Sequence, residues 1–160
     1  MMPSESEKQR SASTSGGAGD QPPASETGNV AKAAPQRPAI LIVEDDFLIA
    51  MEAESALIAA GFQISGIAAT AEEAISLARA HRPAIAIMDI RLAGRRDGID
   101  AAGDLYREVG VRCVFATAHD DQQTRERARP FSPLGWLSKP YTMMSLINQV
   151  REAIAKSSSR

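Results

Sequence analysis

Three carboxylates stand directly after apolar runs of this chain. Residues 39–43 (Ala-Ile-Leu-Ile-Val) run into Glu44 and Asp45, and the apolar residues 84–88 run into Asp89. Carboxylates that meet at one place repel one another unless a cation lies between them, and oxygen ligands suit Mg²⁺. A magnesium ion beside a carboxylate is an arrangement suited to receiving a phosphoryl group, so the pattern points to phosphoryl-transfer chemistry.

These acids meet only if the two apolar runs are neighbouring strands of one sheet. Apolar runs of this length are typical of parallel strands covered on both faces, and the ligand site of such a sheet lies outside the carboxyl ends of its strands. Strand and helix signals alternate, which predicts the α/β class: a flavodoxin-like, doubly wound, five-stranded parallel sheet of order 2-1-3-4-5 with helices on both faces. The expected strands are 39–43, 62–68, 84–88, 111–116 and 136–138.

Helix signals separate these strands. A capping box at residues 70–73 opens one helix, which ends near residues 81–83. The other expected helices are 47–60, 99–109 and 142–155. In the first of them, the apolar residues that recur at helical spacing are Leu48, Met51, Leu57 and Ile58.

The fourth helix of the series is expected to be short or loose. Residues 122–129 can form a helix but are mostly polar. Pro130 and Pro133 then prevent its continuation, because proline lacks the amide hydrogen and clashes with the preceding turn.

The two ends of the chain differ from this central domain, which is expected to span residues 38–156 of the 160. Residues 1–37 are rich in Ser, Gly, Ala, Pro, Glu and Gln and contain one large aliphatic residue, Val30, so a disordered N-terminal extension is predicted. Residues 157–160 are expected to be a frayed end.

Composition excludes several classes of protein. The formal net charge of −2 gives no global basic field for nucleic acid or an anionic membrane. No apolar run approaches the roughly 18–20 residues of a membrane span, and no secretory signal is present. Cys113, the single cysteine, lies in an apolar run and is interpreted as a buried structural thiol. A cytoplasmic location is the expectation.

Over residues 38–156 the chain resembles the receiver domain of two-component response regulators. Glu44 and Asp45 resemble the acid pair that holds Mg²⁺ in that family, one acid directly and the other often through water. Asp89 stands at the position of the phosphoacceptor, which takes the phosphoryl group from a phosphohistidine on a partner kinase. The resemblance also implies that the backbone carbonyl of Arg91 is a metal ligand. Asp46 is expected to begin the first helix instead.

Three later positions extend the resemblance. Thr117 matches the hydroxyl residue that donates a hydrogen bond to a phosphoryl oxygen, and the small Ala118 leaves room for the phosphoryl group. Lys139 matches the lysine whose ammonium reaches the acids and the phosphate, and its bond to Pro140 is typically cis in the family. Trp136 matches an aromatic switch position, for which ordinary core packing is the alternative.

The loop after Asp89 departs from the family pattern. Ala93 stands where most receivers have proline, and the loop is one residue longer before Asp97. The side chains of Arg91 and His119 would border an attacking water, so we hypothesise that they tune the lifetime of the phosphoryl group. The run 115–117 and the polar, proline-containing segment after it resemble a subgroup known mainly from alphaproteobacteria, whose members often stand alone.

The expected function is that of a single-domain response regulator. It would accept a phosphoryl group on Asp89, with Mg²⁺, from a histidine kinase or a histidine phosphotransfer protein, and either signal through a changed protein-binding face or act as a phosphate sink. No DNA binding, no membrane insertion and a monomer or weak dimer are expected, with no enzymatic activity beyond the chemistry of its own phosphoryl group.

Three alternatives remain beside this expectation. A phosphorylation-independent pseudo-receiver would use the fold only for docking, although all the phosphorylation positions are filled. An aspartate-nucleophile phosphatase is disfavoured, because residues 44–48 lack the Asp-x-Asp spacing of those enzymes. A dinucleotide-binding enzyme is disfavoured because no Gly-x-Gly-x-x-Gly follows the first strand.

Overall fold

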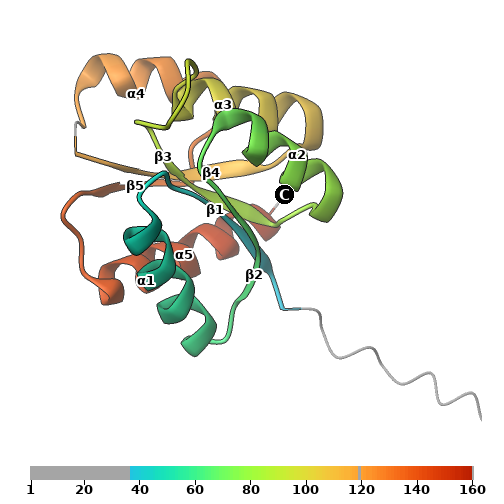
Figure 1. Ribbon diagram of the computed structural model, residues 1–160, viewed down its shortest axis with the longest axis vertical. Coiled ribbons are helices and arrows are strands. Elements are labelled where there is room, and N and C mark those ends of the chain that lie inside the picture. The colour runs from blue at the N-terminus through green and yellow to red at the C-terminus, as the bar shows by residue number, and fades with distance from the viewer. Residues whose placement is uncertain (1–36, 119, 160) are drawn as a thin grey trace, which may run out of the picture. The chain divides into compact units, whose positions relative to one another are not determined.

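One parallel sheet forms the centre of the fold. The computed structural model describes residues 37–118 and 120–159 of the chain. Its strands are β1 (Ala39–Val43), β2 (Gln63–Ala68), β3 (Ile85–Asp89), β4 (Arg112–Thr117) and β5 (Gly135–Ser138). They pair in parallel in the order β2-β1-β3-β4-β5, which confirms the predicted topology (Figure 1).

Helices cover both faces of this sheet. They are α1 (Phe47–Ala59), α2 (Ala71–His81), α3 (Gly98–Asp104), α4 (Gln122–Ala128) and α5 (Met143–Ser158). Helices α1 and α5 lie on one face, and α2, α3 and α4 lie on the other (Figure 1). A π-helical segment, η1 (Leu105–Val109), continues α3, and a 3-10 turn, η2 (Arg129–Phe131), continues α4. Within the described ranges, none of these helices combines the length and the hydropathy that a membrane crossing needs.

The side chains of the central strands alternate between two apolar cores. In β1, Leu41 and Val43 belong to the core under α2 and α3, whereas Ile40 and Ile42 belong to the core under α1 and α5. All four side chains are buried. Because both faces of the strand are covered, it appears in the sequence as a continuous apolar run rather than an alternating one.

The face of α1 that packs on the sheet is not the face that carries most of its large apolar residues. Its buried residues are Ala50, Ala53 and Leu57, so small side chains let the helix lie close to the sheet. Of the four apolar residues whose spacing predicted the helix, only Leu57 is buried. The exposed large apolar residues of α1 are Phe47 (68% exposed), Leu48 (73%), Met51 (44%) and Ile58 (53%).

Helix α4 is short, as predicted. It has seven residues, of which only Ala128 is buried, and Pro130 lies in the 3-10 turn that follows it. Helix α5 begins after Thr142, whose hydroxyl accepts a hydrogen bond from the backbone N–H of Ser145.

Helix α5 is longer than predicted. It continues to Ser158 rather than ending near residue 155, so Ser157 and Ser158 are helical and not part of a frayed end. The hydroxyls of both serines donate hydrogen bonds to the carbonyl of Ile154. These bonds satisfy a carbonyl of the last turn, which the sequence pattern did not reveal.

Candidate functional site

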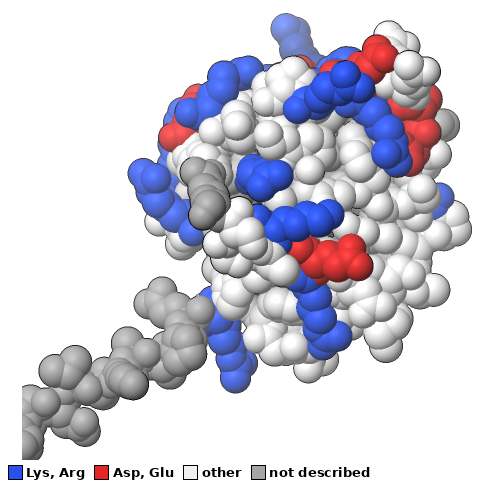
Figure 2. Space-filling model, turned by 180° about the vertical axis from the view of Figure 1, so that it is seen from behind, with Lys and Arg blue, Asp and Glu red and all other residues white. Residues whose placement is uncertain are grey.

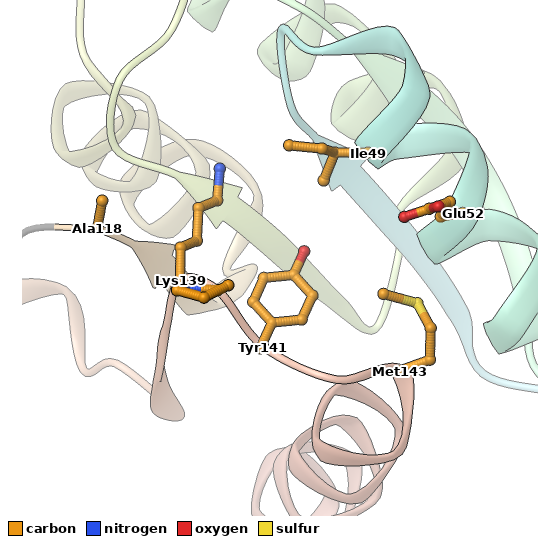
Figure 3. A pocket seen from close by; sticks show the side chains of 7 residues that line it. Ile49, Glu52, Ala118, Lys139, Tyr141 and Met143 are labelled. Atoms are coloured by element: carbon orange, nitrogen blue, oxygen red, sulfur yellow. The ribbon is translucent and has the colours of Figure 1, made fainter.

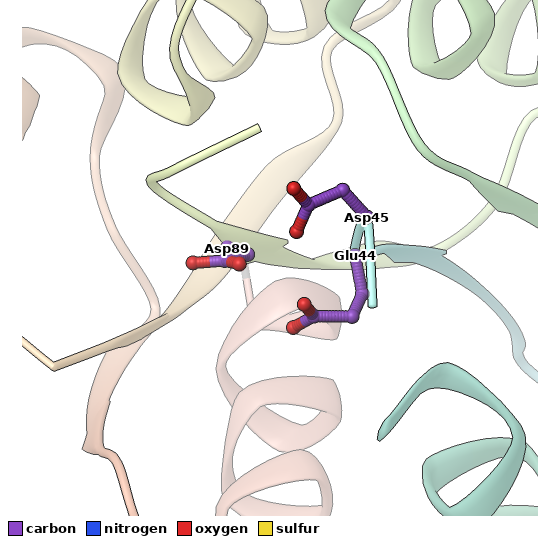
Figure 4. A group of neighbouring side chains, drawn as sticks. All are labelled: Glu44, Asp45 and Asp89. Carbon is purple, nitrogen blue, oxygen red and sulfur yellow. The ribbon is translucent and has the colours of Figure 1, made fainter. Parts of the chain in front are cut away.

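The three predicted carboxylates meet at the carboxyl edge of the sheet. The register of β1 and β3 pairs Val43 with Met88, so Glu44 and Asp89 follow side by side, with Asp45 next to them. Each residue offers one carboxylate oxygen, and these oxygens all lie within 4.8 Å of one another. Figure 4 shows the three side chains converging from β1 and β3.

A single ammonium bridges the two buried acids of this group. Glu44 and Asp89 are 6% and 7% exposed. Lys139, just after β5, places its Nζ 2.9 Å from Glu44 Oε2 and 3.1 Å from Asp89 Oδ2. Three strand ends, β1, β3 and β5, therefore contribute to one charged cluster.

Burial and the neighbouring charges shift the pKa values of Glu44 and Lys139. Burial raises the pKa of the Glu44 carboxyl and the nearby charge of Asp89 adds to this rise, although the hydrogen bond from Lys139 opposes it. Burial alone would lower the pKa of Lys139, but its hydrogen bond to Glu44 and the charge of Asp89 raise it. Lys139 is therefore a cation at neutral pH.

The donor set of this cluster fits a hard divalent cation. Three carboxylates face one ammonium, so the cluster keeps excess negative charge, and oxygen donors suit Mg²⁺. Asp45 is exposed and lines the cavity that opens over the cluster. The other oxygens of the buried pair accept backbone hydrogen bonds at 3.2 Å, Glu44 Oε1 from Asp46 and Asp89 Oδ1 from Arg91.

The remaining predicted residues surround the acids, with one exception. A cavity of about 250 Å³ opens over the cluster. Thr117, the last residue of β4, is buried at its wall beside Ala118 and Arg91. Asp46 also lines the cavity, and its Oδ1 accepts hydrogen bonds from the backbone N–H groups of Leu48 and Ile49, so it caps α1 as expected.

Trp136 is the exception, because it does not line this cavity. It lies in β5 opposite Phe115 of β4, and the two rings stack with centroids 4.8 Å apart. Its half-buried ring packs at the edge of the core under α2 and α3. The guanidinium of Arg125, on α4, lies 5.0 Å from the centre of the ring.

The end of the loop after Asp89 lies so close to the backbone of Asp89 and Ile90 that only glycine fits there. The N–H of Gly98 donates to the carbonyl of Ile90 at 2.7 Å, and a Cβ on Gly98 would lie 1.9 Å from the carbonyl oxygen of Asp89. Asp97 then caps α3 in a reciprocal capping box with Asp100. Sequence reasoning missed both devices, although the Asp-Gly-x-Asp spacing is a signal for such a cap.

A second, mainly apolar cavity adjoins the acidic one and was not predicted. It has a volume of about 400 Å³ and shares Ile49, Ala118 and Lys139 with the acidic cavity. Figure 3 shows Ile49 and Glu52 on α1 across from Tyr141 and Met143, which follow β5. Burial raises the pKa of Tyr141, so its hydroxyl is protonated at neutral pH. No local sequence pattern predicts this cavity, because its walls come from separate elements.

Two further expectations can be compared with the structure. The Lys139–Pro140 peptide bond is cis, as the resemblance implied. Cys113 is buried, as predicted. His119, for which a role beside the phosphoryl group was hypothesised, lies outside the described residues.

Comparison with known proteins identifies the family. A family model described as the response regulator receiver domain matches residues 40–151. The transcriptional regulatory protein PdtaR of Mycobacterium tuberculosis is 36% identical over 124 residues, which are 78% of this chain and 59% of that protein. The phyllosphere-induced regulator PhyR of Methylorubrum extorquens is 35% identical over 112 residues, 69% of this chain and 42% of that protein. The chain thus spans about half the length of these curated relatives.

A solved structure agrees with these matches. The signal receiver domain of a modulated diguanylate cyclase from Desulfovibrio desulfuricans G20 superposes with a TM-score of 0.69 at 35% identity, covering 76% of this chain and 96% of that one. The sheet order and the acidic edge of the sheet are consistent with the matches. This chain belongs to the family of response regulator receiver domains.

Proposed function

We propose that this receiver accepts a phosphoryl group on Asp89 from a phosphohistidine of a histidine kinase or a histidine phosphotransfer protein, with Mg²⁺ bound at the acidic edge. The observation that carries this proposal is the convergence of Glu44, Asp45 and Asp89 around the ammonium of Lys139. Carboxylates that converge with too few cations beside them repel one another and destabilise the fold, and a bound metal ion offsets this repulsion.

The resemblance to the receiver family assigns the metal ligands. Asp45 and Asp89 would hold Mg²⁺ directly, whereas Glu44, the acid nearer to the Lys139 ammonium (2.9 Å against 3.1 Å for Asp89), would act through water. The backbone carbonyl of Arg91 would complete the protein ligands, because this residue lines the same cavity. Bound Mg²⁺ supplies positive charge that offsets the negative charge of the phosphoryl oxygens.

The transfer itself needs a nucleophile and groups that stabilise charge. A carboxylate oxygen of Asp89 attacks phosphorus, the new P–O bond forms, and the P–N bond breaks with its electron pair returning to the histidine ring. Lys139 exchanges one carboxylate partner for a phosphoryl oxygen. The hydroxyl of Thr117, at the wall of the cavity, donates a hydrogen bond to another.

The donor must approach from the open side of the cavity, over α1 and the segment after β5. This surface includes the exposed Leu48 and Met51 and the apolar cavity lined by Tyr141 and Met143. Apolar surface of this kind is typical of protein–protein contact. Figure 2 shows the molecule from behind the view of Figure 1, where acidic side chains lie beside basic ones along the upper rim and near the centre.

The output is a shift between two conformations of the surface near α4. Phosphorylation draws Thr117 toward the phosphoryl group, and Trp136 changes its position between β5 and α4, so a protein partner distinguishes the two states. A role as a phosphate sink would use the same transfer without the partner. Either role places the protein in the cytoplasm with the phosphodonor.

The decisive experiment is the intact mass of the protein after incubation with acetyl phosphate and Mg²⁺. We expect one phosphoryl adduct that disappears with EDTA and in Asp89→Asn. Asp46→Asn is the matched control, because it removes a carboxylate from the same cavity but keeps the three converging acids and the backbone N–H that donates to Glu44, and it should still be phosphorylated. If neither acetyl phosphate nor phosphorylated histidine kinases modify the protein, the phosphoacceptor proposal is wrong and the fold serves as a docking module.

A further inference from the structure

Arg125 joins three parts of the molecule that lie near the proposed switch. From α4, its Nε and Nη2 reach Oδ1 and Oδ2 of Asp120 at 2.5 and 2.6 Å. Its guanidinium also lies over the ring of Trp136, 5.0 Å from the ring centre. One side chain therefore ties α4 both to the loop after β4 and to the ring on β5.

The chemistry of arginine suits both contacts at once. A planar guanidinium forms a two-bond fork with a carboxylate and still stacks on an aromatic face, whereas an ammonium cannot match this geometry. The Trp136 ring packs against the fully buried Phe115 on its core side. Arg125, whose side chain is 51% exposed, covers the ring on its solvent side.

Asp120 lies close in sequence to the proposed switch residue. It lies three residues beyond Thr117, whose hydroxyl is proposed to move toward the phosphoryl group. In the proposed switch, a displacement of this loop would pull on the Asp120 carboxylate that orients Arg125. Helix α4 has only Ala128 buried, so few apolar contacts resist a change in its position.

We infer that Arg125 is a positioning residue that holds the Trp136 ring in its unphosphorylated position and releases it when the loop bearing Asp120 moves. The inference rests on the proposed function, because it assigns the regulation of the same switch. In the unphosphorylated protein Arg125 favours the resting state, and its removal shifts the population toward the state that binds a phosphoryl group.

The test uses Arg125→Gln in the full chain, with Arg129→Gln and Arg127→Gln as controls. Arg129→Gln removes the same charge one turn along, and no ion pair within the described residues includes Arg129. Arg127→Gln removes an ion pair between α4 and Asp97, and the cation–π contacts of the described residues do not include Arg127. Asp120→Asn is a second variant, because it frees the guanidinium without removing it.

Two measurements separate the inference from the proposed function. Trp136 is the only tryptophan, so acrylamide quenching of fluorescence reports on its ring alone. Without Mg²⁺ or phosphate, quenching should rise in Arg125→Gln and less in Asp120→Asn, and stay at the wild-type value in both controls. The apparent affinity for beryllofluoride with Mg²⁺, a phosphoryl mimic, should rise about two- to fivefold in Arg125→Gln, because an exposed cation–π contact is worth about that factor.

Each other outcome has a defined meaning. Unchanged quenching in Arg125→Gln, an equal rise in Arg127→Gln, or an unchanged affinity for beryllofluoride would overturn the inference while wild-type binding leaves the proposed function standing. If the wild-type protein binds no beryllofluoride and is not phosphorylated, the proposed function fails and the inference fails with it, whatever the quenching shows.

Discussion

The acidic cluster makes a quantitative prediction about stability: Asp89→Asn should stabilise the metal-free fold. Asp89 is buried beside Glu44, and the two share the ammonium of Lys139. Asparagine preserves the size of the side chain and can still accept a hydrogen bond from Lys139, but it removes one buried negative charge. The variant therefore keeps the shape of the site and changes its electrostatics.

The magnitude follows from the distances within the cluster. At an effective dielectric constant of about 20, two charges within 4.8 Å, as for Glu44 and Asp89, repel by about 3.5 kcal/mol, and the exposed Asp45 adds about 1 kcal/mol at the dielectric of water. The ammonium of Lys139, 3.1 Å from Asp89, attracts by about 5 kcal/mol. Attraction and repulsion nearly cancel, so the desolvation cost of the buried carboxylate is left without compensation.

We therefore expect Asp89→Asn to raise the free energy of unfolding by about 2 kcal/mol in EDTA, or the Tm by about 8 °C for a domain of this size. Mg²⁺ should reduce this difference in the free energy of unfolding. At 100 times its Kd a ligand of the folded state stabilises it by about 2.7 kcal/mol, and the variant should gain less because it lacks one ligand.

Urea denaturation followed by circular dichroism, with EDTA and with Mg²⁺, measures both effects. Asp46→Asn is the control: asparagine caps a helix about as well as aspartate, so a change below about 0.5 kcal/mol and a normal response to Mg²⁺ are expected. A loss of stability for Asp89→Asn in EDTA would show that the Lys139 bridge outweighs desolvation and would refute the reasoning. An equal gain from Mg²⁺ in variant and wild type would show that Asp89 is not a ligand.

Three further predictions concern other parts of the domain. Burial alone would raise the pKa of Asp97, but hydrogen bonds from Arg127 and the backbone lower it. The Asp97 carboxylate therefore stabilises the fold at pH values above its pKa in the unfolded chain, and this stabilisation is lost as the pH falls through its pKa in the folded protein. Urea titrations should therefore show Arg127→Gln less stable by about 0.5 kcal/mol at pH 7, with the difference vanishing well below pH 4 or so. Gly98→Ala should cost about 3 kcal/mol in the same assay and reduce phosphorylation, because its Cβ would overlap the carbonyl of Asp89; wild-type stability would contradict the steric argument. Burial raises the pKa of Cys113 to about 12, so an aromatic disulfide reagent at neutral pH should modify it only after unfolding, and rapid reaction of the native protein would contradict its burial.

The features that the sequence predicted best are those set by long apolar runs. A strand covered on both faces must be apolar throughout, so β1 and β3 could be recognised without a structure. The alternation of strands and helices then predicts a doubly wound sheet, and the order 2-1-3-4-5 is predicted because it makes the first and third strands neighbours at the switch point. The meeting of Glu44 with Asp89 is a consequence of that topology, since both follow neighbouring parallel strands.

The features that the sequence did not predict depend on side-chain shape. The buried face of α1 consists of Ala50, Ala53 and Leu57 because close approach to the sheet favours small residues over the more hydrophobic Leu48. Hydrophobicity alone cannot make that choice. The apolar cavity beside the acids likewise forms only when separate elements pack.

Polar contacts between residues far apart in the chain could not be predicted from the sequence either. Arg125 lies in a polar helix and would ordinarily be interpreted as a solvated charge, yet it contacts Trp136 and Asp120. No local pattern specifies such a partner, because the distance between two side chains is set by the packing of the whole domain.

The small buried area of α4 also affects how the domain opens. A helix of seven residues with one buried side chain is too short to persist by itself, so its amide protons should exchange with solvent through local opening, at a free energy well below that of the sheet. The amides of β1 and β3 should exchange only when the whole domain unfolds. Conformational change can thus be confined to α4, which opens and refolds locally. The surface presented to a partner then changes while the central sheet stays folded.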